Sequence, residues 1–219
     1  MTVDSTERDQ FVAASSEYKA FLGTFERTSN PVETNLLCAD DPDAVIQTYA
    51  DNPSDITDGS LGENISVELV EERGYEVKWP VDGFDEGDAS EIGPDIIAYD
   101  SVSDEWLIVE AKTVTSTEAV GKSLLDTDAY DGDAQLHNDW IRNSLEKLES
   151  ENKIDSELVD QIDTAIATNS ITKEVVLVRD VDGASHRTLQ EPQSDDTDVS
   201  LENVAGVDKV TVVELAASE

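Results

Sequence analysis

One segment, Ser60 to Thr113, constrains the fold of this chain more than any other, because a helix pattern is followed directly by three strand patterns. Residues 60–63 have the form of a helix capping box, apolar residues follow at intervals of four, and Gly74 lies where a helix would end. Alternating and continuous apolar runs then predict three strands. We expect these strands at residues 75–81, 95–99 and 106–113.

The rest of the chain adds elements on both sides of this segment. Its apolar periodicity predicts helices over residues 5–27, 134–149 and 156–169, and strands over residues 174–179 and 209–215. Residues 28–59 contain three prolines and many Asp and Asn residues, and are expected to form short helical pieces and loops. This order of helices and strands favours an α/β layer fold.

Acidic residues outnumber basic residues along the whole chain. Its 219 residues include 51 Asp or Glu and 14 Lys or Arg, which gives a formal net charge of −37. Residues 1–60 carry 12 acidic and 3 basic side chains, residues 61–150 carry 23 and 6, and residues 151–219 carry 16 and 5. An excess spread this evenly indicates a surface adapted to a salt-rich cytoplasm, not a local acidic tail. It therefore says little against one small nucleic-acid site.

The sequence offers no signal for a membrane or for secretion. No stretch approaches the roughly 20 apolar residues that a membrane helix needs, and the first ten residues lack the basic and apolar regions of a signal peptide. We therefore expect a soluble, cytoplasmic protein with no membrane partner. Cys38, the single cysteine, is interpreted as a small hydrophobic residue without a catalytic role.

Two carboxylates and one ammonium are expected to meet near the ends of two neighbouring strands. Because side chains alternate along a strand, Glu110 and Lys112 share one face, and Ala111 points to the other. Asp95 begins the preceding strand, and antiparallel pairing would bring it close to the later part of its partner. Carboxylate oxygens suit Mg²⁺ or Mn²⁺, which binds substrate phosphate and lowers the pKa of a bound water. The pattern therefore suits phosphodiester hydrolysis.

Pro94-Asp95 and Glu110-Ala111-Lys112 resemble the signature of the PD-(D/E)XK nuclease superfamily. The resemblance implies an α/β restriction-endonuclease-like fold, with an αβββαβ core whose mixed central sheet is flanked by helices, and a divalent-metal-dependent endonuclease activity. By this resemblance Asp95, Glu110 and the Ala111 carbonyl bind Mg²⁺ or Mn²⁺, and Lys112 is the catalytic lysine. Nucleic acid is the expected partner, with DNA favoured over RNA by family frequency.

The same resemblance adds two residues to the site and divides the chain. Glu63 matches an acidic residue that many members carry on the helix before the strands, where it can help to hold the metal. Gln135, at the start of the helix expected over 134–149, is similar to a polar residue that some subfamilies place near the site. Residues 60–219 then form the nuclease-like domain, and residues 1–59 form an N-terminal helical accessory segment.

Structural interpretations stay open beside the functional ones. Glu63 fits the capping box, Gln135 fits a helix N-terminus, and Lys112 could simply pair with Glu110 on an exposed strand. His137 and His186 lack Cys or His partners at ligand spacing, so zinc is not expected. The same fold could also have lost its activity and could bind a basic protein partner through its acidic surface. The N-terminal helix could mediate homodimer formation or docking.

Overall fold

The computed structural model describes residues 33–38, 42–50, 59–80, 93–114, 125–126, 133–179 and 206–215. The helix expected over residues 5–27 lies outside these ranges. In chain order the described elements are β1 (Glu33–Cys38), α3 (Pro42–Tyr49), α4 (Gly59–Glu72), β2 (Glu76–Trp79), β3 (Ile96–Asp100), β4 (Glu105–Val114), α5 (Asn138–Ser150), α6 (Ser156–Thr168), β5 (Ile171–Arg179) and β6 (Lys209–Glu214).

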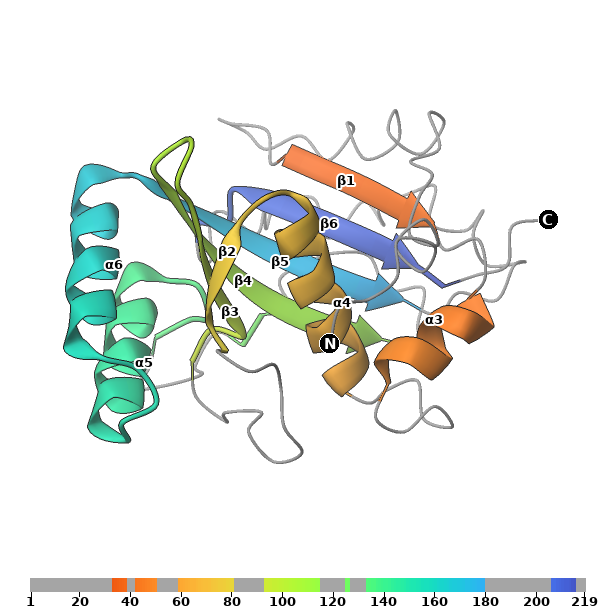
Figure 1. Cartoon of the computed structure of the whole chain (residues 1–219), viewed down its shortest axis with the longest axis horizontal. Helices are drawn as coiled ribbons and strands as arrows, with labels where there is room; N and C mark the ends of the chain where they lie inside the picture. The colour runs from red at the N-terminus through yellow and green to blue at the C-terminus, as the bar shows by residue number, and fades with distance from the viewer. Residues whose placement is uncertain are drawn as a thin grey trace, which may run out of the picture.

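The strands form one mixed sheet in the order β1-β6-β5-β4-β3-β2 (Figure 1). The pairs β4–β5, β5–β6 and β6–β1 are parallel. The pairs β2–β3 and β3–β4 are antiparallel, so these three strands form a meander. The chain is therefore an α/β protein with a mixed central sheet flanked by helices, as predicted. β1 was not expected: it lies within the stretch assigned to short helical pieces and loops, and it pairs with β6 in the central sheet.

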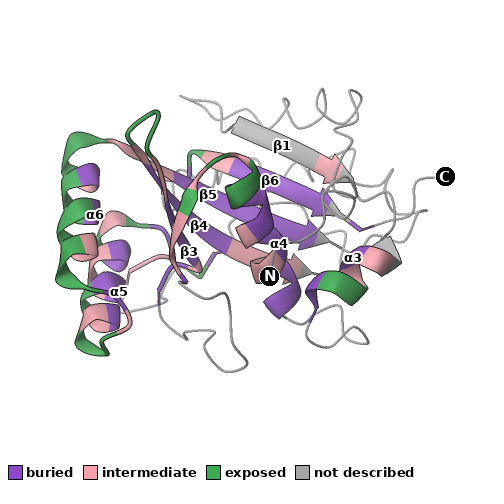
Figure 2. Ribbon diagram, viewed as in Figure 1, coloured by how far each residue is buried: buried purple, intermediate pink, exposed green. Residues whose placement is uncertain are grey.

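Helices cover both faces of the sheet. One face packs against α3 and α4 through a core that includes Leu61, Ile65 and Val109. The other face packs against α5 and α6 through a core that includes Ile108, Trp140 and Ile162. Figure 2 shows the central strands buried and the outer sides of α5 and α6 exposed. Burial of β4 on both faces explains why its sequence is apolar at consecutive positions.

Local signals in the sequence set the ends of several elements. α4 ends close to Gly74, whose φ of 91° lies in the left-handed region that favours glycine. α6 begins after Asp155, whose side chain accepts a hydrogen bond of 2.9 Å from the Leu158 amide, and ends at Asn169 in the left-handed conformation. These caps explain why the predicted and observed bounds of both helices agree closely.

The described elements that precede α4 belong to the same layered fold as the rest of the described chain. Val45 and Tyr49 of α3 are buried in the core that α4 shares with the sheet. The Tyr49 carbonyl also accepts a hydrogen bond of 2.8 Å from the Asn64 side chain of α4. β1 and α3 are thus part of the layered fold. None of the helices in the described part of the chain has the length and apolar character that crossing a lipid bilayer requires.

Candidate metal site

The antiparallel pairing of β3 and β4 brings Asp95 to the carboxyl-terminal half of β4. Ile96 pairs with Val109, so Asp95, one residue earlier, lies beside Glu110. The Ala111 amide donates a hydrogen bond of 2.6 Å to Asp95 Oδ2. Alternation along the strands puts Glu110 and Lys112 on the face that carries Ile108, which is covered by α5 and α6. The structure therefore brings Asp95, Glu110 and Lys112 together as the spacing predicted.

Glu110 is held by two donors on one of its oxygens. Its side chain is 3% exposed, and Oε1 accepts hydrogen bonds of 2.6 Å from Lys112 Nζ and 2.6 Å from Gln135 Nε2. Oε2 is buried and has no hydrogen-bond partner within the described part of the chain. Burial raises the pKa of the Glu110 carboxyl, and the two donors act against this shift. A buried carboxylate oxygen without a partner destabilises the folded state unless a cation or a hydrogen-bond donor contacts it.

Asp95 is destabilised as an anion by its surroundings. Burial raises its pKa well above the usual range, and the neighbouring Glu110 carboxylate raises it further. The Ala111 amide and the Lys112 ammonium act in the opposite direction. Two acidic groups thus lie side by side with less positive charge around them than two anions require. A divalent cation between them would supply that charge.

Lys112 carries a positive charge in this setting. Burial opposes the charge, but Glu110, together with Asp95 and Asp126, outweighs burial and raises the pKa of the ammonium. One of its three N–H donors contacts Glu110, which leaves two for other acceptors. The side chain is 27% exposed, so part of it is in contact with solvent.

Gln135 reaches the site from a turn, not from a helix. The sequence predicted it at the start of a helix over 134–149, but α5 begins at Asn138, three residues later. Leu136, buried and with φ of 65°, turns the chain between the two. This correction has a physical cause: burial of Leu136 in the core under α5 outweighs the cost of a left-handed conformation in a non-glycine residue.

Glu63 lies on α4, on the far side of the sheet from α5. Its negative charge contributes to raising the pKa of Asp95, so it acts on the site through space. The described residues contain one group of three His, Cys, Asp or Glu side chains whose ligand atoms all lie within 4.8 Å of one another, and it includes none of Glu63, Asp95 and Glu110. α4 begins at Gly59, one residue before the expected cap Ser60. Glu63 is therefore an outer contributor to the site's negative charge in this structure.

The Ala111 carbonyl also faces the site. In an extended strand the N–H and C=O of one residue point to the same side, and the Ala111 N–H points to Asp95. The donor set is then two carboxylates and one backbone carbonyl, with one buried carboxylate oxygen unpartnered. Hard oxygen donors of this kind fit Mg²⁺ or Mn²⁺. The residues present therefore fit the metal that the sequence predicted.

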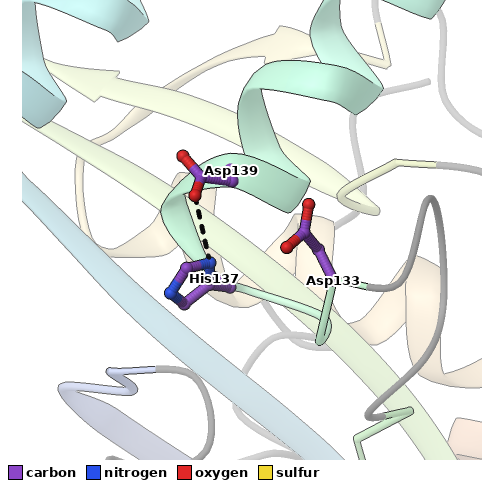
Figure 3. Close-up of side chains that lie close together, drawn as sticks. All are labelled: Asp133, His137 and Asp139. Atoms are coloured by element: carbon purple, nitrogen blue, oxygen red, sulfur yellow. Dashed lines mark ion pairs between the residues drawn. The ribbon is translucent and has the colours of Figure 1, made fainter.

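A second group of ligand-type side chains lies on the surface at the start of α5. It consists of Asp133, His137 and Asp139, shown in Figure 3. His137 Nδ1 lies 4.0 Å from Asp139 Oδ2, and Arg142 already binds the other Asp139 oxygen at 3.2 Å. The sequence indicated no Cys or His partner for His137 at ligand spacing, and its neighbours in this group are two carboxylates. An Asp two residues after a His at a helix start was the available signal, and it is a common surface pattern.

A buried ion pair lies on the opposite face of the sheet, one register position from Glu110, because Glu174 pairs with Val109 and Val175 pairs with Glu110. Arg73, which follows α4, donates hydrogen bonds of 2.8 Å to both carboxylate oxygens of Glu174 on β5. Thr211 donates to the same carboxylate at 2.5 Å, and Lys209 Nζ lies 3.9 Å away. Glu174 is fully buried and every one of these groups is satisfied, so the cluster joins α4 to the sheet.

No known protein family, curated protein or solved structure matches this chain.

Proposed function

We propose that this protein is a divalent-metal-dependent nuclease that hydrolyses phosphodiester bonds, with DNA favoured over RNA. One observation carries the proposal: the buried, unpartnered Glu110 Oε2 lies on a carboxylate fixed by Lys112 and beside a second carboxylate, Asp95. Two neighbouring buried carboxylates destabilise each other as anions, so a purely structural ion pair does not account for them. A site that binds a cation between them does account for them.

The order of elements also supports a restriction-endonuclease-like core. α4 is followed by the meander β2, β3 and β4, and α5 and α6 lead back to β5, parallel to β4. This order fits the αβββαβ core implied by the PD-(D/E)XK resemblance, with α6 as an addition. The positions of Pro94-Asp95 before β3 and of Glu110-Ala111-Lys112 within β4 support this resemblance.

Each residue has a role in the proposed reaction. Asp95, Glu110 and the Ala111 carbonyl would hold Mg²⁺ or Mn²⁺, which supplies Lewis acidity and a water of lowered pKa when bound. Lys112 keeps one donor on Glu110 and directs its remaining donors to the attacking water or to the phosphate oxygens. Glu63 adds negative charge that favours cation binding.

A cleavage assay tests the proposal, with a matched control on another strand of the same sheet. β2 also carries a Glu-x-Lys pair, Glu76 and Lys78, whose Nζ and Oε1 atoms lie 2.5 Å apart, but its glutamate is exposed. With Mg²⁺ at molar KCl we expect Lys112→Ala to slow plasmid DNA cleavage on the order of 10²–10³-fold, and Lys78→Ala to cleave like the wild type.

Two results would contradict the nuclease proposal. Equal cleavage by wild type and Lys112→Ala would assign the activity to a contaminant or to other residues. No cleavage of DNA or RNA by the wild type, together with metal-independent binding of a basic protein, would favour an inactive fold that acts through its acidic surface.

A further inference from the structure

Gln135 is held at both ends of its side-chain amide. Nε2 donates to Glu110 Oε1 at 2.6 Å, and Oε1 accepts from the Asp126 backbone amide at 2.8 Å. The Gln135 backbone amide in turn donates to the Asp126 carbonyl at 2.9 Å. The main chain of Asp126 therefore binds Gln135 twice, once through its backbone and once through its side chain.

The two contacts determine which way the amide points. The Asp126 N–H is a donor and can only meet the amide oxygen, whereas the Glu110 carboxylate is an acceptor and can only meet the amide nitrogen. Glutamate at position 135 would place an acceptor against Glu110, and asparagine would be one methylene shorter. Of the natural side chains of this length, glutamine alone offers an acceptor at one end and a donor at the other.

Asp126 is itself anchored by the residue before it. Leu125 is 2% exposed and packs in the core beneath α5, among residues that include Trp140 and Leu136. The chain thus runs from a buried anchor, Leu125, through the Asp126 main chain and the Gln135 amide to Glu110. The sequence predicted Gln135 and Glu110 at one site but gave no indication of Leu125 or Asp126, since main-chain donors leave no residue pattern.

We propose that Gln135 is a positioning residue, oriented by the main chain of Asp126, that fixes Glu110 so that its unpartnered Oε2 is presented to a divalent cation. This inference rests on the proposed metal site and adds residues that hold its ligand Glu110 in position. With Oε1 occupied by Lys112 and Gln135, rotation of the carboxylate would break two hydrogen bonds. Such outer contacts typically change metal affinity 10–100-fold.

The test compares Gln135→Met with a matched variant elsewhere. Gln161 also donates its Nε2 to a glutamate, Glu157, at 3.3 Å, on the exposed side of α6. By isothermal titration at molar KCl, we expect Gln135→Met to weaken Mn²⁺ binding on the order of tenfold or more, and Gln161→Met to leave it unchanged. Gln135→Glu keeps the Asp126 contact and loses the donor to Glu110, so it should fail to restore the affinity.

Two further measurements examine the anchor. Hydrogen exchange at the Asp126 amide, followed without metal, should accelerate in Gln135→Met because its acceptor is gone. Asp126→Pro removes the same N–H and also the carboxylate that acts on Lys112, so it is compared with Asp126→Ala, which removes the carboxylate alone. Relative to Asp126→Ala, Asp126→Pro should weaken Mn²⁺ binding when Gln135 is present and have no further effect in the Gln135→Met background. Circular dichroism and thermal unfolding confirm that each variant is folded. If Asp126→Pro does not fold, the hydrogen exchange result alone tests whether the Asp126 amide holds the Gln135 side chain.

The outcomes separate this inference from the nuclease proposal. Unchanged Mn²⁺ affinity in folded Gln135→Met, or unchanged Asp126 exchange, overturns the inference and leaves the nuclease proposal standing. Mn²⁺ binding that depends on Gln135 in a wild type that cleaves no nucleic acid overturns the nuclease proposal alone. A wild type that binds no Mn²⁺ overturns both.

Discussion

At the scale of single residues, the buried charged groups Glu110, Lys173 and Glu174 differ in the partners that the described residues give them. Glu174 is matched by Arg73 and Thr211, whereas Glu110 keeps an oxygen without a partner. Lys173 on β5 is 7% exposed, and burial lowers its pKa to about 8, with Arg142 adding to the effect and Asp208 opposing it. Buried charge is costly, so each of these residues affects stability or function.

The depressed pKa of Lys173 predicts how stability depends on pH. In the unfolded chain the pKa of a lysine is about 10.4, so between pH 8 and that value the unfolded state binds more protons than the native state. The Lys173 contribution to the free energy of unfolding should therefore rise through this interval, by about 3 kcal/mol at most. Chemical denaturation of wild type and Lys173→Met from pH 7 to pH 10 measures the difference. Parallel profiles for the two proteins would contradict the assignment.

At the scale of elements, the approach of α4 to β4 positions the strand end that carries the site. A Cβ atom at position 62 would clash with Thr113 Oγ1 and would lie 3.5 Å from the backbone carbonyl carbon of Lys112. Only glycine allows the helix to lie this close to the strand. The contact is next to Lys112, so the helix supports the site from the opposite face of the sheet.

Substitution of Gly62 tests this close packing. Gly62→Ala should destabilise the protein by about 1–3 kcal/mol through the clash with Thr113, although alanine favours the helix by about 1 kcal/mol. Thr113 Oγ1 is buried and has no hydrogen-bond partner within the described residues, so Thr113→Ala loses no hydrogen bond there. Urea unfolding should show that the double variant recovers most of the loss. Additive effects of the two substitutions would mean that the contact does not limit the packing.

The sequence predicted those elements whose signals are local. Examples are the apolar run of β4, the cap of α6 and Gly74 after α4. Each of these signals lies within or next to the element that it predicts. β1 was missed because Glu33–Cys38 is short and mixed in polarity, and its strand conformation depends on pairing with β6, far along the chain.

The candidate site likewise contains residues that the sequence predicted and contacts that it could not predict. Alternation within β4 and the turn before it were enough to predict that Asp95, Glu110 and Lys112 would meet. The turn that carries Gln135, and the Asp126 main chain that holds it, depend on tertiary packing around Leu136. The spacing of side chains therefore predicted the charged groups, and could not predict the backbone groups that orient them.

At the scale of the whole molecule, the net charge of −37 dominates behaviour in solution. Like charges on one surface repel, and the repulsion is longest-ranged in dilute buffer, where the Debye length is about 30 Å at 0.01 M and falls to about 3 Å at 1 M. The melting temperature should therefore rise as KCl increases to molar concentrations. Calorimetry across a KCl series at fixed pH measures it, and a flat or falling melting temperature would contradict the interpretation of the charge as adaptation to salt.

The same charge affects how a nucleic acid would bind. Phosphate attraction is weak at molar salt, so affinity must depend on shape, on cation bridging at Asp95 and Glu110, or on a partner protein. Metal binding is for this reason central to the account. A cation that is bound at these two residues would be both the reactive group and a main contact to substrate.

Binding of Mg²⁺ by the wild type and three variants tests the central claim most directly. At constant molar KCl, where diffuse binding to acidic surfaces is screened, Mg²⁺ should raise the melting temperature of the wild type and of Glu76→Gln, the matched exposed glutamate on β2. Asp95→Asn and Glu110→Gln should lose that rise. Equal stabilisation of all four proteins, or none in the wild type, would contradict a metal site at Asp95 and Glu110.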